Sequence, residues 1–157
     1  MSPALQILQA ASGVVDGYGC DCSTECCRFG VTGREPWLTR AEFDVVTTAV
    51  KAQGRKLPLP DDDDDDGRCP FLGADDRCGI YAARPLGCRT FFCDRTTHPD
   101  GRSGLLPSST NKLLRVFPGQ LQALTPSEES KPLGAWLRAS RTPGQRASSS
   151  SKKKQRR

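Results

Sequence analysis

Cysteine thiols are the side chains of this sequence best suited to chemistry. The chain of 157 residues holds eight cysteines, all of them between positions 20 and 93. Thiolates in groups of four are soft ligands that select zinc, cuprous copper or iron–sulfur clusters. The candidate metal ligands are therefore Cys20, Cys22, Cys26, Cys27, Cys69, Cys78, Cys88 and Cys93.

The cellular compartment decides between metal ligation and disulfides. No apolar run approaches the roughly 18 residues of a membrane span, and residues 1–8 lack the basic region and long apolar core of a secretory signal. We therefore expect a cytoplasmic protein without a membrane segment, in a compartment where thiols stay reduced. A disulfide scaffold is the alternative, and it would require export or an unusually oxidising cytosol.

The spacing of the cysteines indicates which of them bind the same metal ion. Zinc sites usually take ligands in pairs that are separated by two to four residues. Three residues lie between Cys22 and Cys26, and four lie between Cys88 and Cys93. Two phenylalanines stand between Cys88 and Cys93 and would shield a bound ion from water. We therefore expect Cys88 and Cys93 to share one centre.

The adjacent pair Cys26 and Cys27 suggests unequal roles. Neighbouring side chains on an extended backbone point in opposite directions, so the two thiols are hard to place on one tetrahedral ion. We expect them to serve different partners, one the metal and the other a second metal or the core. For any single cysteine the alternative is a buried free thiol that acts as a small hydrophobe.

Arginines accompany the cysteines along the chain. A site of four thiolates keeps excess negative charge with either zinc or a common cluster, and nearby guanidinium groups would offset it and donate hydrogen bonds to sulfur. Surface exposure or pairing with carboxylates is the alternative. The arginines concerned are Arg28, Arg84, Arg89 and Arg95.

Nothing in the sequence assigns a catalytic residue. A nucleophilic cysteine needs a base, and the one histidine, His98, stands among turn residues, where we expect an exposed loop side chain. Phosphate-binding glycine loops, H-E-x-x-H helices and G-x-S-x-G elbows do not occur. A metal protein without a defined reaction is therefore preferred over an enzyme.

Two helices are predicted in the first third of the chain. Residues 2–16 combine a Ser2 N-cap with apolar residues at helical spacing. Residues 39–53 form the clearest helix, because Thr39 and Glu42 make a capping box before the apolar positions.

The rest of the chain gives weaker signals. A helix of one or two turns is expected around residues 81–85, and short helices are expected over 111–117 and 128–139, limited by Pro118 and Pro132.

The apolar core predicted from the sequence is small, and structural zinc can supply on the order of 10 kcal/mol of binding energy coupled to folding. We expect a small, irregular, α-rich single domain, α+β at most, organised around a cysteine-bound metal site.

Charge divides the chain at its C-terminal end. The seven cations of residues 141–157 exceed the net charge of +5, so the body, residues 1–140, is net negative. Residues 1–140 are the predicted domain, and residues 141–157 are a disordered basic tail. If nucleic acid is a partner, the tail is the part of the chain that would bind it. The six aspartates at 61–66 read as a solvated loop rather than a cation site.

The order of the motifs resembles the YkgJ-type cysteine-cluster proteins, which are described as zinc- or iron-chelating domains. The resemblance covers roughly residues 18–95 and implies metal chelation, with an iron–sulfur cluster in some relatives and no settled reaction. The motifs are Cys26-Cys27, Leu38-Thr39-x-x-Glu42, Cys69-Pro-Phe-Leu, Cys78-Gly-Ile-Tyr81, Arg84-Pro85 and Cys88-Arg89.

One gap in the first cysteine group departs from that family pattern. The family commonly places two residues between its first two cysteines and two before the adjacent pair, whereas these gaps are one and three here. Ser23 thus stands where the second cysteine is usual. We expect Cys22 to contribute less to metal binding than its neighbours.

Three functions follow, in order of preference. The first is a zinc- or iron-binding protein with a structural, carrier or electron-transfer role and no membrane partner. The second is an iron–sulfur enzyme or enzyme subunit, which a pocket with polar groups beside the cysteines would favour. The third is a zinc protein whose basic tail anchors it to nucleic acid, which salt-sensitive binding through the tail would favour. No protein partner is predicted.

Overall fold

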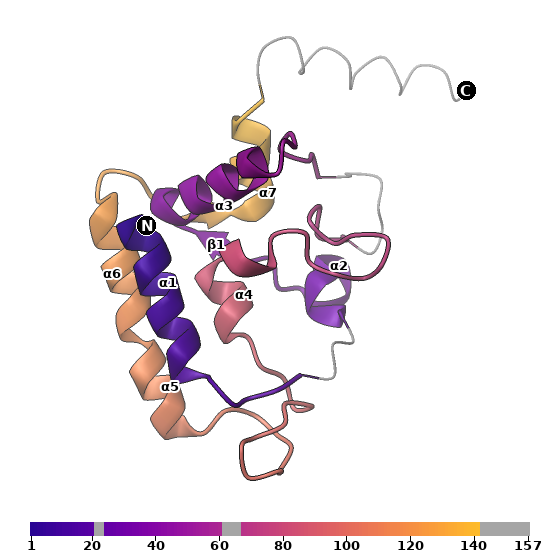
Figure 1. The fold of residues 1–157 in the computed structure, drawn as a ribbon, viewed down its shortest axis with the longest axis vertical. Helices are drawn as coiled ribbons and strands as arrows, with labels where there is room; N and C mark the ends of the chain where they lie inside the picture. Colours follow the sequence, from indigo (N-terminus) through magenta and orange to yellow (C-terminus); the bar gives the residue numbers. More distant parts are fainter. Residues whose placement is uncertain (21–23, 61–66, 142–157) are drawn as a thin grey trace.

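The computed structural model describes residues 1–20, 24–60 and 67–141, and it is α-rich with little sheet, as predicted (Figure 1). Within these ranges no helix is long and apolar enough to cross a bilayer. The helices are α1 (Pro3–Val14), α2 (Phe29–Thr32), α3 (Arg40–Ala52), α4 (Leu86–Thr90), α5 (Ser108–Leu114), α6 (Val116–Leu124) and α7 (Leu133–Ala139).

Shorter elements connect these helices. The 3-10 turns η1 (Glu25–Cys27) and η2 (Tyr81–Ala83) precede α2 and α4. The strands β1 (Trp37–Leu38) and β2 (Lys131–Pro132) pair in antiparallel fashion, with Trp37 opposite Pro132. This pairing brings the start of α7 beside the start of α3.

Helices α1 and α3 begin at the residues that the sequence predicts. Ser2 Oγ accepts a hydrogen bond from the Leu5 N–H at 3.3 Å and caps α1. Thr39 Oγ1 accepts from the Glu42 N–H at 3.3 Å, while Glu42 Oε2 accepts from the Thr39 N–H at 2.8 Å. The predicted capping box of α3 is therefore confirmed.

The predicted helices near the C-terminus have wrong limits. In place of one helix over 111–117 the chain forms α5 and α6, and Pro118 lies in the first turn of α6. A proline is tolerated there because its missing N–H would have no intrahelical acceptor. The helix predicted over 128–139 begins only at Leu133, because the preceding residues pair as β2.

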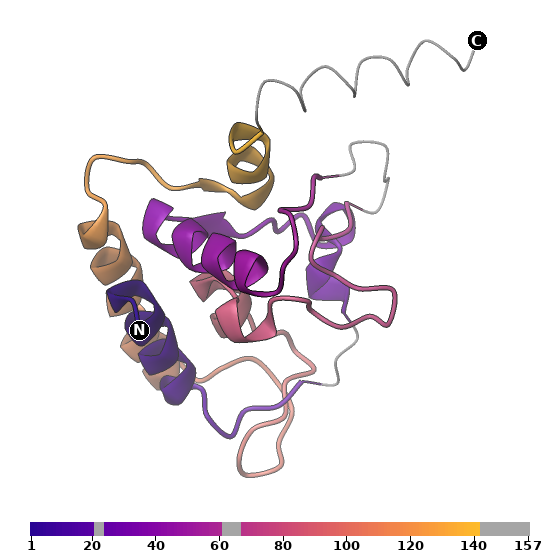
Figure 2. The same cartoon turned by 45° about the horizontal axis from the view of Figure 1, so that its top comes forward.

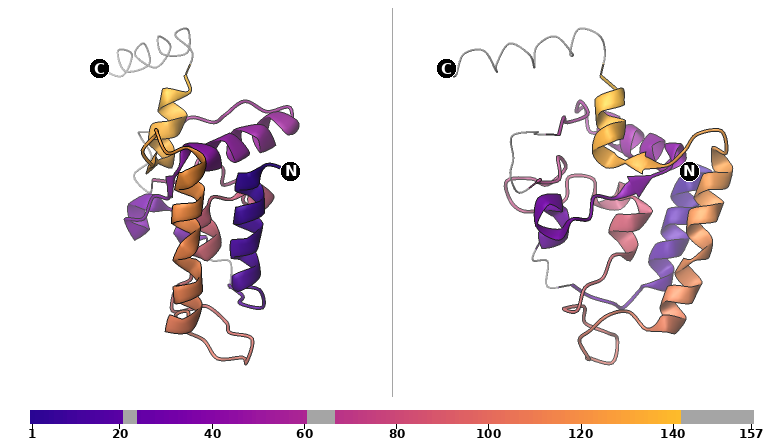
Figure 3. Two further views of the ribbon diagram at one scale, coloured as in Figure 1. Left: turned by 90° about the vertical axis from the view of Figure 1, so that its left-hand side faces the viewer. Right: turned by 180° about the vertical axis from the view of Figure 1, so that it is seen from behind.

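The core lies where the longer helices meet. Figures 1 and 3 show α1 alongside α5 and α6, with α3 across one end of this layer and α7 next to α3. Leu8, Val46 and Leu121 come from α1, α3 and α6 and are fully buried. Phe43 of α3 stacks on Trp136 of α7 with ring centroids 5.2 Å apart. These contacts fix two layers, one of α1, α5 and α6 and the other of α3 and α7, on which the cysteine segments rest.

The second cysteine segment is anchored to this core by apolar side chains. Phe71 and Ile80 are 2 % and 4 % exposed and belong to the main core cluster. Each of them follows a cysteine by two positions, and those cysteines, Cys69 and Cys78, pack against the same cluster. Figure 2 shows α4 between the layer of α1 and α6 on one side and α2 on the other.

Candidate functional site

Backbone hydrogen bonds join the two cysteine segments. The Cys69 N–H donates to the Cys27 carbonyl at 2.7 Å, and the Phe29 N–H donates to the Gly67 carbonyl at 2.9 Å. Gly67 has a φ of +56°, and a Cβ at this position would lie 2.6 Å from the backbone nitrogen of Gly30. Only glycine fits here, because both the left-handed conformation and the close approach exclude a side chain.

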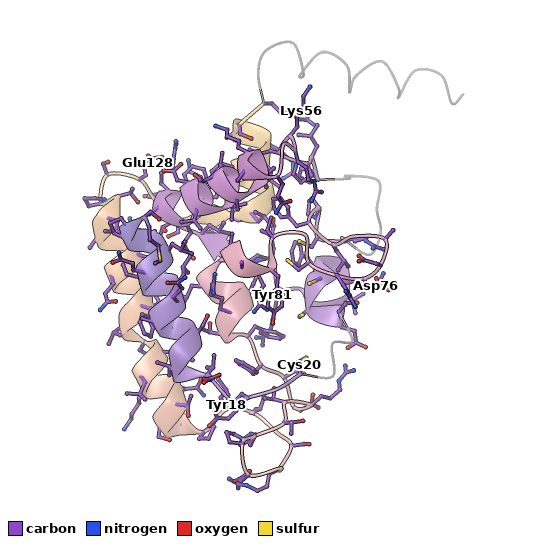
Figure 4. The ribbon with its side chains drawn as sticks, viewed as in Figure 1. Tyr18, Cys20, Lys56, Asp76, Tyr81 and Glu128 are labelled. Carbon is purple, nitrogen blue, oxygen red and sulfur yellow. The ribbon has the colours of Figure 1, made fainter. Side chains whose placement is uncertain are left out.

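Most of the described cysteines line one cavity of about 1260 Å³. Figure 4 shows sulfur atoms gathered between α2 and α4, and Cys20 lies at the edge of this region, on the chain that follows Tyr18. Cys93 does not line the cavity, and Cys22 lies outside the described residues. The cysteines of the lining are Cys20, Cys26, Cys27, Cys69, Cys78 and Cys88.

The thiols share a cavity without converging on one point. Within the described ranges, no three side chains of His, Cys, Asp or Glu are placed so that they could hold one metal ion. The donor set nevertheless has the chemistry of a zinc or iron site, because it consists of soft sulfur ligands on two segments that are already joined. These segments need to close around an ion to complete a coordination sphere.

Cys26 and Cys27 lie in the turn η1, so the extended backbone assumed for them is wrong. Both line the cavity, and the Cys27 thiol donates a hydrogen bond to the Cys26 sulfur. This hydrogen bond lowers the pKa of Cys26 to about 6 and raises the pKa of Cys27. The preceding residue of the turn, Thr24, has a φ of +58°, which is rare for a β-branched side chain.

Three further thiols of the cavity, Cys69, Cys78 and Cys88, are held in their protonated form. Burial raises the pKa of Cys69 to about 11 and that of Cys88 to about 12, and neighbouring thiols act in the same direction. Burial also raises the pKa of Cys78. A metal ion that binds these thiols must therefore displace their protons.

Of the four flanking arginines, Arg84 lines the cavity. Its guanidinium carbon lies 3.7 Å from the centroid of the Tyr81 ring, and its Nε donates to the Tyr81 carbonyl at 3.1 Å. Burial raises the pKa of Cys78 and Cys88, and the positive charge of Arg84 opposes this effect. Arg84 is thus placed to offset the negative charge of a metal–thiolate centre.

The remaining three arginines have other contacts. Arg89 is buried and donates to the Arg84 carbonyl at 2.6 Å, to Ser12 Oγ at 2.8 Å and to the Ala82 carbonyl at 2.5 Å, so that it joins α1 to the segment around η2. Arg95 pairs with the Glu25 carboxylate. The backbone of Arg28 bridges that of Arg68.

Glu42 is a site residue whose full role the sequence did not reveal. The residue is 3 % exposed and lines the cavity. Oε2 accepts from the Thr39 N–H and hydroxyl, as the capping box predicts, whereas Oε1 accepts from the Leu86 N–H at 2.9 Å. The last contact depends on the tertiary fold, so no local signal in the sequence could have indicated it.

His98 is not the exposed side chain that the sequence predicts. It is half-buried, its ring contacts the Tyr18 ring edge-on at 5.2 Å, and its Nε2 lies 3.1 Å from the Gly104 carbonyl. His98 does not line the thiol cavity. Its contacts indicate a structural role in the loop that follows Cys93.

A family model agrees with the position of this site. The model CxxCxxCC, described as "Putative zinc- or iron-chelating domain", matches residues 19–102, which is more than half of the chain. The matched range includes all eight cysteines together with Glu42 and Arg84. No curated protein and no solved structure matches the chain.

Proposed function

The chain belongs to the CxxCxxCC family, which the YkgJ-type resemblance already indicated, and from this membership we propose that it binds zinc or iron through the thiols of its cavity. The observation that supports the proposal most strongly is the shared cavity of Cys26, Cys27, Cys69, Cys78 and Cys88. These residues come from two segments that only the tertiary fold brings together.

The contacts suggest an order among the candidate ligands. Burial raises the pKa of Cys88, and the positive charge of Arg84 acts on this thiol as it does on Cys26 and Cys78. Cys20 lies at the edge of the sulfur group, and Cys93 lies outside the lining of the cavity. Cys22 remains a predicted ligand. Cys88 and its neighbours in the cavity are therefore proposed as the main ligands, with Cys20 and Cys93 in secondary roles.

Metal binding is expected to draw the two cysteine segments together. The thiols do not yet surround one point, so the ion would add bonds between η1 and the segment that Phe71 and Ile80 anchor. Anything that binds the folded state and not the unfolded state raises the free energy of unfolding. Bound zinc would supply a structural link, whereas an iron–sulfur cluster would supply an electron-transfer centre.

The test is to purify the protein without oxygen and to measure zinc, iron and acid-labile sulfide per chain. We expect a metal close to stoichiometric with the chain, and sulfide with a brown colour would identify a cluster. Cys88→Ser serves as the comparison, since it should lose the metal. A folded, metal-free protein with reduced thiols would contradict the proposal.

The proposed anchoring to nucleic acid gains no support from the structure. It rests on residues 141–157, of which 142–157 lie outside the described residues. The run of aspartates at 61–66 also lies outside them.

One observation favours the enzyme hypothesis, because a large cavity with polar groups lies beside the thiols, as that hypothesis requires.

A further inference from the structure

The cavity is much larger than a metal ion requires. Its volume of about 1260 Å³ exceeds the roughly 300–1,000 Å³ of pockets that hold small organic molecules. The thiols form one part of its wall. The rest of the wall includes Arg34 between α2 and β1, Trp37 of β1, Phe91 after α4 and Pro118 in the first turn of α6.

Arg34 supplies a positive charge to this second part of the wall. Its guanidinium carbon lies 5.1 Å from the centroid of the Phe91 ring. Arg84, by contrast, is the arginine whose charge acts on Cys26 and Cys78. A metal–thiolate centre would thus be offset mainly by Arg84, and the charge of Arg34 stays available for another anion.

The carboxylates of the lining do not neutralise Arg34. Glu35 accepts from the Gly134 N–H at 2.5 Å at the start of α7, and Glu42 accepts from the Leu86 N–H at the start of α4. Each of these two carboxylates is offset by the partial positive charge of a helix N-terminus. The third carboxylate of the lining, Asp76, pairs with Arg68 at 3.6 Å. Among the described residues, no carboxylate forms an ion pair with Arg34.

Aromatic rings line the same cavity, and one of them, Phe91, lies under this charge. Trp37 lines the cavity and is 63 % exposed, although a large apolar ring is normally covered in a folded protein. Phe91, which carries the Arg34 guanidinium on its face, lines the same cavity. Flat apolar rings next to a guanidinium complement a ligand with a planar body and an anionic group.

We propose that the part of the cavity formed by Arg34, Trp37 and Phe91 binds a flat organic molecule that carries a carboxylate, phosphate or sulfonate group. The guanidinium of Arg34 pairs with the oxyanion, and the rings contact the planar body. This ligand lies beside the thiols and would approach any metal bound there. Its binding does not depend on the metal, so it can be tested separately from the proposed function.

Two fluorescent probes with the same ring system test the charge requirement. Anilinonaphthalene sulfonate carries a sulfonate, and phenylnaphthylamine is its neutral counterpart. Each is titrated into the full-length protein, and metal per chain and thermal unfolding are measured on the same samples. We expect the anionic probe to bind at least about tenfold more tightly, a difference of about 1.4 kcal/mol.

Variants then assign this preference to the site. Arg34→Gln should remove the preference for the anionic probe, and Trp37→Ala should weaken the binding of both probes. Arg115→Gln removes an exposed arginine outside the cavity and should leave both affinities unchanged. Metal content should stay the same in Arg34→Gln, since Arg34 is not proposed to act on the thiols.

The outcomes separate the two proposals. Equal affinity for both probes in the parent protein, or full retention of the anion preference in a folded Arg34→Gln variant, would overturn the ligand site. A parent protein without metal that still prefers the anionic probe would overturn metal binding and support the ligand site.

Discussion

The carboxylate of Glu42 accepts a hydrogen bond from the backbone N–H of Leu86 at 2.9 Å, although the two residues are 44 positions apart in the chain. The same carboxylate closes the capping box of α3 with Thr39. Leu86 is the first residue of α4, the helix that carries Cys88. One buried side chain therefore fixes the start of two helices and, through α4, the position of one thiol.

Replacing Glu42 tests this link. Glu42→Gln should lower the free energy of unfolding by about 1–3 kcal/mol, because an amide offers one oxygen acceptor and leaves a buried N–H unpaired. Denaturant unfolding measures the change. Asp44→Asn is the matched control on the same helix, where the Arg40 pair is exposed and should contribute at most about 1 kcal/mol. Equal losses would show that the buried link adds nothing.

Metal content of single cysteine variants tests the order of the ligands. Cys88→Ser should remove most of the bound metal, because this thiol lies in the cavity beside the other sulfur ligands. Cys93→Ser should remove less, since Cys93 lies outside the lining, although the spacing in the sequence predicts equal losses for the two. Cys22→Ser should also remove less than Cys88→Ser. A larger loss for Cys93 or Cys22 would reverse the order.

The affinity for zinc should rise with pH. The pKa of Cys69 is raised to about 11 and that of Cys88 to about 12, so both thiols are protonated at neutral pH and release protons to the solvent when they bind metal. Each released proton changes the affinity by up to about tenfold per pH unit. Competition with a chelator between pH 6 and 8 measures the slope, and a pH-independent affinity would exclude these thiols as ligands.

Two glycine variants separate strain from steric contact. Gly67 and Gly54 both have a positive φ, but a Cβ at Gly67 would lie 2.6 Å from the Gly30 nitrogen, whereas a Cβ at Gly54 meets nothing within 4 Å. Gly54→Ala should cost about 1–2 kcal/mol of unfolding free energy. Gly67→Ala should cost more and also lower the metal content, because it separates the cysteine segments. The same loss in both variants would argue against the close approach.

A truncation after Arg141 tests the predicted tail. Residues 142–157 contain no large apolar side chain and have little surface to bury, so their removal should leave metal content and thermal stability unchanged. Metal analysis and thermal unfolding of the truncated and full-length chains provide the comparison. A clear drop in either quantity would mean that these residues contribute to the domain.

Local rules in the sequence predicted the parts of the fold that depend on neighbouring residues. The capping box of Thr39 and Glu42 and the cap at Ser2 were predictable because each hydrogen bond spans three positions. The α-rich class followed from the same patterns. The cysteines could be named as candidate ligands by residue type alone, since thiolates are strong soft ligands wherever they stand.

Relations between distant residues could not be predicted in this way. Pro118 reads as a helix limit by itself, and it lies inside the first turn of α6 because Leu121 and Phe117 pack into the core. Cys26 and Cys27 lie in a turn rather than an extended segment. The exclusion of Cys93 from the cavity reflects the course of the chain after α4, for which spacing gives no signal.

The backbone link between Cys27 and Cys69 has a consequence for the newly made protein. Ribosomes add about 5–20 residues per second, so the roughly 40 residues between these cysteines take about 2–8 s to synthesise. During that interval the thiols of η1 have been synthesised, whereas Cys69, whose backbone bonds to that of Cys27, has not. The proposed donor set can assemble only after Cys88 has emerged, so a metal bound by the full set would be acquired late in translation or after it.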